Sequence, residues 1–415
     1  MRINLEHKVA LPVFAAIILA SCRSNAGEYP TAQQPETPKP QASASPSPAP
    51  SLTPTSWIRY SPTSTPPAAV SLLPITSENA HNIEPLFTIP LPWPAYSEGL
   101  LEVSPDGKLL ALAESRGPLT ILPLPWQGDG KVIPGARLSS GRSYNFRTVS
   151  LSFSADSNQL AVVDDGDLVA IIDFRDAGRA KILAPIEWPT SAVFTEEGAK
   201  VAIGTMRGLN GSVQLWDLAT ASHLRDISRD SPSGGVCSLA TSPDESALAA
   251  GYCTYVFDIR TWDITADYSP LSRLTGLDEV PYCSHFCDEN RNILRFDPAT
   301  GFLASGTNKW RIPLYDVRSK ALEFVLTTLR VTDGSESSQP YPVSGLVFSH
   351  DGNMLALSAG NELQIRDPGT GAFLWHHDLE PWEYAYTAIA ITPDSRMLIS
   401  TDSSPELQFW GIPAQ

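Results

Sequence analysis

The sequence predicts an all-β fold built from seven consecutive four-stranded antiparallel meanders. Residues 343–378 read as one complete meander, in which Val343–Phe348 is an apolar strand and three shorter strands follow, separated by turns that contain glycine. Versions of this pattern recur at a spacing of about 48 residues. The last meander lacks an outer strand at the end of the chain, and residues 84–89 read as a spare strand that could supply it.

Each meander opens with an apolar strand that ends in a turn of the Ser-Pro-Asp-Gly type. Proline presets φ at the second position of such a turn, and Asp and Gly tolerate the bridge and left-handed regions that follow. The seven first strands with their turns lie at 100–107, 149–157, 191–198, 236–245, 293–301, 343–352 and 387–395.

A buried second strand and an alternating third strand follow each turn. The predicted second strands are 109–113, 160–163, 201–204, 247–251, 302–306, 354–358 and 397–400. The predicted third strands are 119–124, 168–174, 213–218, 255–259, 312–317, 363–367 and 407–410. Pairing of 84–89 with 406–411 would remove the open seam between the first and last meanders.

Several of these segments resemble the WD-repeat β-propellers. Residues 213–220 (VQLWDLAT) are close to the ending of that family's third strand, and 153–156 and 347–352 are similar to its inner strand and turn. The resemblance covers roughly residues 83–412 and implies a seven-bladed β-propeller with one meander per blade. The Gly-His pair that opens many such repeats is absent, and most of the predicted third strands lack the Trp-Asp pair. The chain is therefore identified as a divergent member.

The N-terminus reads as an export signal followed by a lipid attachment site. Arg2 and Lys8 precede an apolar run of twelve residues, Val9–Ala20, which is too short to span a bilayer as a helix. The exit at 19–22 (LASC) resembles the bacterial lipobox. That resemblance implies cleavage before Cys22 and lipidation of its thiol. An ordinary secretory peptide with a chance cysteine is the alternative.

Composition divides the chain into three parts. Residues 1–21 are the predicted signal peptide. Residues 22–80 are a predicted disordered tether, because this stretch holds 12 of the 37 prolines together with abundant Ser and Thr. Residues 81–415 are the predicted propeller domain. The net charge of −16 argues against a nucleic-acid partner, because phosphate backbones select basic surfaces.

Four cysteines fall in the predicted domain, and in an exported protein they favour disulfides. Cys237 and Cys253 belong to one hairpin and are candidates for a cross-strand bond, whereas Cys283 and Cys287 could close a small loop. A metal site that includes His285 is the alternative for that loop, but only three ligands are local. We predict no metal and no cofactor. Residues 164–167 (DDGD) are predicted to form a tight turn rather than a calcium loop.

Aromatic residues precede several inner strands and are predicted to share one face around the central channel. The residues of this possible binding face are Trp93, Tyr96, Trp188, Tyr282, Tyr341, Trp382 and Tyr384. They could simply fill the joints between blades, or they could bind a protein or a glycan.

The leading hypothesis is a protein-binding or scaffolding module, monomeric by itself, that is held outside the cytoplasm on a bacterial membrane by its lipid. An envelope hydrolase or lyase at the channel mouth is the enzymatic alternative, although the sequence contains no motif for a catalytic site. A purely structural envelope protein is the third possibility.

Overall fold

In the computed structural model, the described residues are 58–60, 71–91, 99–114, 119–124, 130–133, 148–176, 179–183, 186–207, 211–228, 234–253, 258–274, 293–306, 311–327, 331–332, 335–336, 343–379, 385–404 and 406–414. All of them lie in one unit, 49–415.

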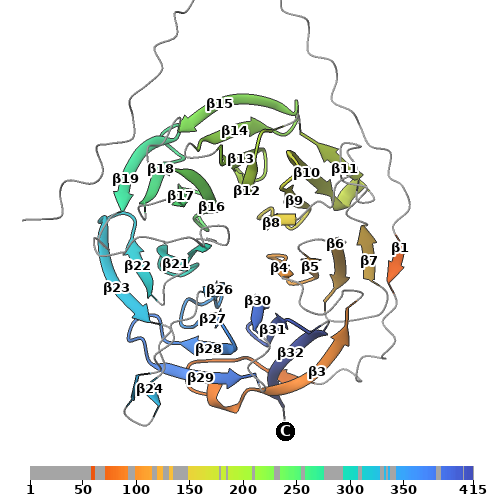
Figure 1. Ribbon diagram of the computed structural model, residues 1–415, viewed down its shortest axis with the longest axis vertical. Helices are drawn as coiled ribbons and strands as arrows, with labels where there is room; N and C mark the ends of the chain where they lie inside the picture. Colours follow the sequence, from red (N-terminus) through yellow and green to blue (C-terminus); the bar gives the residue numbers. More distant parts are fainter. Residues whose placement is uncertain are drawn as a thin grey trace, which may run out of the picture. The chain divides into compact units, whose positions relative to one another are not determined.

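Seven antiparallel sheets follow one another along the described chain and surround a central channel (Figure 1). The inner strands are β4 (Gly99–Val103), β8 (Thr148–Phe153), β12 (Pro189–Thr195), β16 (Gly235–Thr241), β20 (Ile293–Phe296), β26 (Val343–Phe348) and β30 (Tyr386–Ile391). The second strands are β5 (Leu109–Glu114), β9 (Gln159–Asp164), β13 (Lys200–Thr205), β17 (Ala247–Cys253), β21 (Phe302–Gly306), β27 (Leu355–Ala359) and β31 (Met397–Asp402).

The third strands are β6 (Leu119–Pro123), β10 (Leu168–Asp173), β14 (Val213–Asp217), β18 (Asp258–Asp263), β22 (Arg311–Asp316), β28 (Glu362–Arg366) and β32 (Glu406–Pro413). The outer strands are β7 (Gly130–Ile133), β11 (Arg179–Ile182), β15 (Ser222–Ser228), β19 (Ser269–Leu274), β23 (Ala321–Thr327), β29 (Phe373–Asp378) and, in the last blade, β3 (Glu84–Pro90). The predicted seven-bladed β-propeller with four-stranded blades is confirmed. The short elements outside this scheme are the hairpin of β24 (Val331–Thr332) and β25 (Ser335–Glu336), and the 3-10 turns η1 (Ala80–Asn82) and η3 (Phe174–Asp176).

One predicted third strand ends too early. In the fourth blade it was expected at 255–259, whereas β18 runs over Asp258–Asp263, and residues 255–257 lie outside the described part of the chain. In the register, Trp262 lies opposite Leu248, just as Trp216 of the third blade lies opposite Val201. The Trp262-Asp263 pair therefore repeats the Trp-Asp ending of β14.

The ring is closed by the predicted exchange between the two ends of the chain. β3 pairs with β32, from Glu84 opposite Gly411 to Pro90 opposite Glu406. The rings of Phe87 and Phe409 stack across this pair with centroids 4.4 Å apart. The seam is thus held by a hydrogen-bonded ladder and by apolar packing.

The folded part begins before the predicted boundary at residue 81. β2 (Leu72–Leu73) pairs with β32, and Ile75 is buried in the cluster that contains Trp410 and Ile412. Farther upstream, β1 (Ile58–Tyr60) pairs with β7 of the first blade. Two segments of the predicted tether are therefore strands of the flanking blades, because short apolar runs interrupt its proline-rich composition.

The turns between first and second strands share one hydrogen-bonding scheme in five blades. A Ser or Thr hydroxyl donates to the Asp two residues later at 2.6–2.7 Å, and it accepts from a backbone N–H five residues later at 2.8–3.1 Å. The hydroxyls are those of Ser104, Ser154, Ser242, Ser349 and Thr392. The fourth residue of each of these turns has a positive φ, as the turn chemistry predicts.

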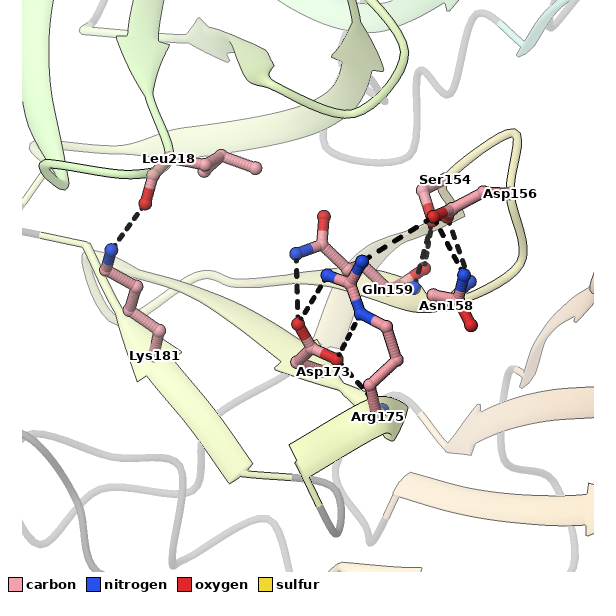
Figure 2. Close-up of polar contacts among 8 residues, drawn as sticks. All are labelled: Ser154, Asp156, Asn158, Gln159, Asp173, Arg175, Lys181 and Leu218. Atoms are coloured by element: carbon pink, nitrogen blue, oxygen red, sulfur yellow. Dashed lines mark hydrogen bonds and ion pairs between the residues drawn. The ribbon is translucent and has the colours of Figure 1, made fainter.

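Figure 2 shows this turn in the second blade, beside an ion pair that fixes the start of η3. Asn158 N donates to Asp156 Oδ1 at 3.0 Å, and Arg175 Nη2 donates to Asp173 Oδ2 at 2.7 Å. The hydrogen bond from Arg175 lowers the pKa of Asp173 to about 2. On the same blade, Lys181 Nζ donates to Leu218 O of the third blade and so links the two outer edges.

The core is distributed between the blades. Each of seven buried apolar clusters in the described part of the chain combines side chains from the facing sides of two adjacent blades. The cluster that joins the last and first blades, for example, contains Leu110, Leu122, Ile399 and Phe409. No blade has a complete core of its own, so each depends on its two neighbours.

Candidate functional site

The inner strands of all seven blades line the channel, which encloses about 140 Å³. Representative lining residues, one from each blade in order, are Leu101, Ser150, Ala192, Ser238, Ile293, Ser344 and Ala388. Most of these side chains are small or apolar. A charged side chain in this channel therefore has few polar neighbours.

Serines in the channel wall hold neighbouring inner strands together. Leu239 N donates to Ser191 Oγ at 3.1 Å, which joins the fourth blade to the third. In the same way, Leu294 N of the fifth blade donates to Ser238 Oγ at 3.3 Å. These bonds give the serines of otherwise apolar strands a structural role.

One ion pair crosses the channel. Arg295 on β20 and Glu102 on β4 belong to the fifth and first blades, and Arg295 Nη2 lies 3.5 Å from Glu102 Oε2. Burial raises the pKa of Glu102, an effect that the nearby charge of Arg295 opposes. The pair therefore places two opposite charges in the wall of the channel.

Trp188 is 59% exposed, although tryptophan has the largest side chain. It directly precedes β12, and its backbone is held from two blades. Trp188 N donates to Asp167 Oδ1 of the second blade at 2.9 Å, and Met206 N of the third blade donates to Trp188 O at 2.9 Å. Trp188, Asp167 and Met206 thus define one surface, which we call the connection face.

The backbone of Trp188 is in the left-handed region, with φ of +54°. A bulky side chain in this region is a genuine outlier, and proline at position 189 further restricts the residue before it. The two hydrogen bonds stabilise this conformation against its intrinsic cost. The fold therefore fixes the backbone from which the exposed indole projects.

Further apolar and charged groups lie beside Trp188. Met206 is also exposed, and it packs so closely over Gly235 that a Cβ at that glycine would lie 2.1 Å from Met206 Cγ. Glu187 and Arg207 form an exposed ion pair at 3.4 Å. The connection face thus combines an exposed indole and a thioether with a charged rim.

The turn at 164–167 is the predicted tight turn between β9 and β10. Gly166 N donates to Asp164 Oδ1 at 2.8 Å. Burial raises the pKa of Asp164 to about 6, and the charges of Asp165 and Asp167 add to this effect. Within the described residues, no group of three His, Cys, Asp or Glu side chains is arranged to hold a metal.

Cys237 lies in a bulge of β16, lines the channel and is disulfide-bonded. The backbone of Cys253 ends β17 opposite Gly235, two residues from Cys237 along the partner strand. The side chain of Cys253 lies outside the described part of the structure, as do Cys22, Cys283 and Cys287. The same holds for the predicted binding-face residues Trp93, Tyr96, Tyr282, Tyr341, Trp382 and Tyr384.

Sequence reasoning missed the pair of Glu102 and Arg295, as well as Met206 and Asp167. A signal for the pair was present, because each charged residue interrupts an apolar inner strand, in LLEV at 100–103 and in ILRF at 293–296. The support of Trp188 by Asp167 and Met206 had no signal, because it depends on how two blades meet.

No protein-family model matches the sequence, and no curated protein matches it significantly. In the described part of the chain, no helix is long and apolar enough to cross a membrane. The described residues form a seven-bladed β-propeller with blades of four antiparallel strands.

Proposed function

We propose that this protein is a lipid-anchored, extracytoplasmic propeller, divergent from the WD-repeat type, that binds another protein through its connection face and acts by binding rather than by catalysis. The observation that carries the proposal is Trp188, an exposed indole whose backbone is fixed from two blades. An aromatic side chain has only two rotatable bonds and therefore loses little conformational entropy on binding, and tryptophan is enriched among the residues that dominate interface energies.

The backbone conformation of Trp188 supports the same proposal. A residue held in the left-handed region costs on the order of 1–3 kcal/mol and persists only where the surrounding structure enforces it. Such residues cluster at binding and catalytic sites. Met206 extends the exposed apolar surface beside the indole, and the pair of Glu187 and Arg207 gives it a polar rim.

The proposed location rests on the N-terminal sequence. Residues 9–22 combine the apolar core of a signal peptide with the LASC exit, and a fatty acyl chain contributes about 0.8 kcal/mol per buried methylene. We expect radiolabelled palmitate to be incorporated into the wild-type protein but not into Cys22→Ala. Equal labelling of both proteins, or of neither, would contradict the lipid anchor.

Site-specific crosslinking tests the binding face. A photoreactive residue is placed at position 188 in the membrane-anchored protein, and a matched one at position 224 of β15, where Leu224 is 47% exposed. We expect a discrete crosslinked protein from position 188 only, and we expect Trp188→Ala to abolish co-purification of that protein while Leu224→Ala leaves it intact. The same products from both positions would refute the assignment of the face.

A glycan is the second candidate ligand, because an exposed indole also stacks on sugar rings. Digestion of the crosslinked product distinguishes the two classes. A protein partner is removed by protease and yields peptides by mass spectrometry, whereas a glycan partner survives protease and is released by glycosidases.

We also propose that Cys253 is the disulfide partner of Cys237. The β16–β17 register supports this pairing, because it brings the two residues to neighbouring positions across the hairpin. Peptide mapping without reductant should recover the peptides of Cys237 and Cys253 joined, and with reductant separate. Recovery of Cys237 joined to the peptide of Cys283 or Cys287 would overturn the pairing.

A further inference from the structure

The ion pair in the channel has geometry that leaves most of its bonding capacity unused. The 3.5 Å separation between Arg295 Nη2 and Glu102 Oε2 exceeds the roughly 2.7–2.9 Å of charge-assisted hydrogen bonds. Arg295 Nη1 turns back to the carbonyl oxygen of Leu294, at 3.0 Å. In the same molecule, Arg175 and Asp173 show what close pairing looks like, with two guanidinium nitrogens at 2.7 and 3.0 Å from the carboxylate oxygens.

The surroundings of the pair make this loose contact costly. Glu102 and Arg295 are 30% and 39% exposed, and both line the channel, whose other lining residues are small or apolar. Charges that are withdrawn from bulk water are stable only when their partners satisfy them with good geometry. Among the described residues, each charged group has donors or acceptors to spare, and both line a space that can hold a ligand.

The size and lining of the space limit what that ligand can be. A channel volume of about 140 Å³ is close to that of a cavity known to hold one benzene molecule, which has six non-hydrogen atoms. Leu151, Val193 and Leu346 contribute apolar walls, whereas Ser150 and Ser152 bring hydroxyls from β8, the inner strand next to β4. The space therefore suits a small molecule with a compact apolar part.

From this arrangement we propose that the channel binds a small α-amino acid in its zwitterionic form. The ligand carboxylate accepts two hydrogen bonds from the guanidinium of Arg295, and its ammonium group donates to the carboxylate of Glu102. The long Glu102–Arg295 contact is replaced by two shorter ones, and a small apolar side chain occupies the rest of the space.

The pairing of opposite charges selects a zwitterion over singly charged molecules. A simple carboxylate would satisfy Arg295 but would lie beside the like charge of Glu102. A simple ammonium ion would satisfy Glu102 but would lie beside the like charge of Arg295. Only a ligand that carries both groups a few ångströms apart neutralises both residues at once.

Titration calorimetry on the full-length protein, with L-alanine as the probe, tests this proposal. We expect saturable binding of one L-alanine per chain, and binding of propanoate and ethylamine at least about tenfold weaker, since each lacks one charge-assisted contact. Arg295→Gln and Glu102→Gln should each weaken L-alanine binding by at least about tenfold. Arg318→Gln is the matched control, because Arg318 lies on the exterior in a pair with Asp244, and it should leave the affinity unchanged.

Two further results complete the test. If a single variant fails to fold, the exchanged double variant Glu102→Arg with Arg295→Glu keeps the pair and should retain L-alanine binding within about tenfold of the wild type. Absence of saturable binding of L-alanine to the wild-type protein, or equal affinity for propanoate, would show that the pair binds only water and would overturn the proposal. Trp188→Ala should not alter L-alanine binding, so this test is independent of the proposed protein partner.

Discussion

Two buried tyrosines in different blades show how the hydrogen bonding of one hydroxyl affects stability. Tyr315 on β22 is buried, and its hydroxyl has no hydrogen-bond partner among the described residues, whereas the buried Tyr252 on β17 shares a hydrogen bond of 3.0 Å with Ser228. Burial also raises the pKa of Tyr315 to about 12, so the neutral phenol is the form to consider. An unsatisfied buried hydroxyl costs roughly 1–3 kcal/mol.

We therefore expect Tyr315→Phe to stabilise the protein by about 1 kcal/mol and Tyr252→Phe to destabilise it by about the same amount. Urea unfolding followed by tryptophan fluorescence would measure both. A loss of stability in Tyr315→Phe equal to that in Tyr252→Phe would show that the Tyr315 hydroxyl has a partner.

Asp164 makes the stability of the second blade depend on pH. Burial raises its pKa from the ordinary value of 3.8 to about 6, so the folded state favours the protonated acid. The penalty for ionising this side chain is absent below about pH 4, grows between pH 4 and 6, and is fully present above pH 6. Asp164→Asn removes the charge and can keep the hydrogen bond from Gly166 N.

The expected result is that Asp164→Asn stabilises the protein at pH 7.5 by on the order of 1–2 kcal/mol and has no such effect at pH 4. Asp165→Asn, at the exposed neighbouring position, should change stability by less than about 0.5 kcal/mol at either pH. Thermal unfolding at the two pH values measures both variants, and a gain for Asp164→Asn that is the same at pH 4 and pH 7.5 would exclude the titration of Asp164 as its cause.

Among the strands, β3 has the largest expected effect on the stability of the ring, because it completes the last blade although it precedes the first blade in the sequence. Ile89 of β3 is buried in the cluster with Leu407 and Phe409. Ile89→Ala should cost about 2–5 kcal/mol, and the exposed Leu224→Ala on β15 should cost less than about 1 kcal/mol. Deletion of residues 81–92 should lower the melting temperature further than Ile89→Ala. A melting temperature unchanged by the deletion would mean that β3 does not close the ring.

The strands also show what the sequence can and cannot predict. The meanders, their turns and the pairing of 84–89 with 406–411 were predictable, because turn chemistry and apolar periodicity are local signals. The end of the third strand in the fourth blade was predicted four residues too early, because that end is set by pairing with β17, which continues to Asp263. β1 and β2 were missed because two or three residues carry no periodicity, and only the edge they pair with makes them strands.

The same distinction holds for the functional residues. The position of Trp188 before an inner strand was predictable, but its left-handed backbone and its support by Asp167 and Met206 arise where two blades meet. Likewise, Glu102 and Arg295 lie 193 residues apart in the chain and meet only because the blades form a ring. Contacts across the channel depend on the number and rotation of the blades, which no local segment encodes.

For the whole molecule, the distribution of the core between blades implies cooperative unfolding of a closed ring. Each of the seven clusters is shared by two neighbours, and β3 joins the last blade to the first. In an open array of repeats, a destabilised repeat unfolds with its nearest neighbours. In a closed ring, every blade has two interfaces, and the unfolding of one blade exposes both.

Leu248→Ala in β17 tests this cooperativity from the fourth blade, far along the chain from the seam. Leu248 is fully buried, so the substitution should cost about 2–5 kcal/mol. In the intact chain, we expect amide protection in β32 of the seventh blade to fall by the same free energy as protection in β17, because both exchange through unfolding of the whole ring. In a chain without residues 81–92, the loss should be confined to the fourth blade and its neighbours. Hydrogen exchange followed by mass spectrometry resolves these segments, and a loss confined to β16–β19 in the intact chain would show that the blades unfold independently.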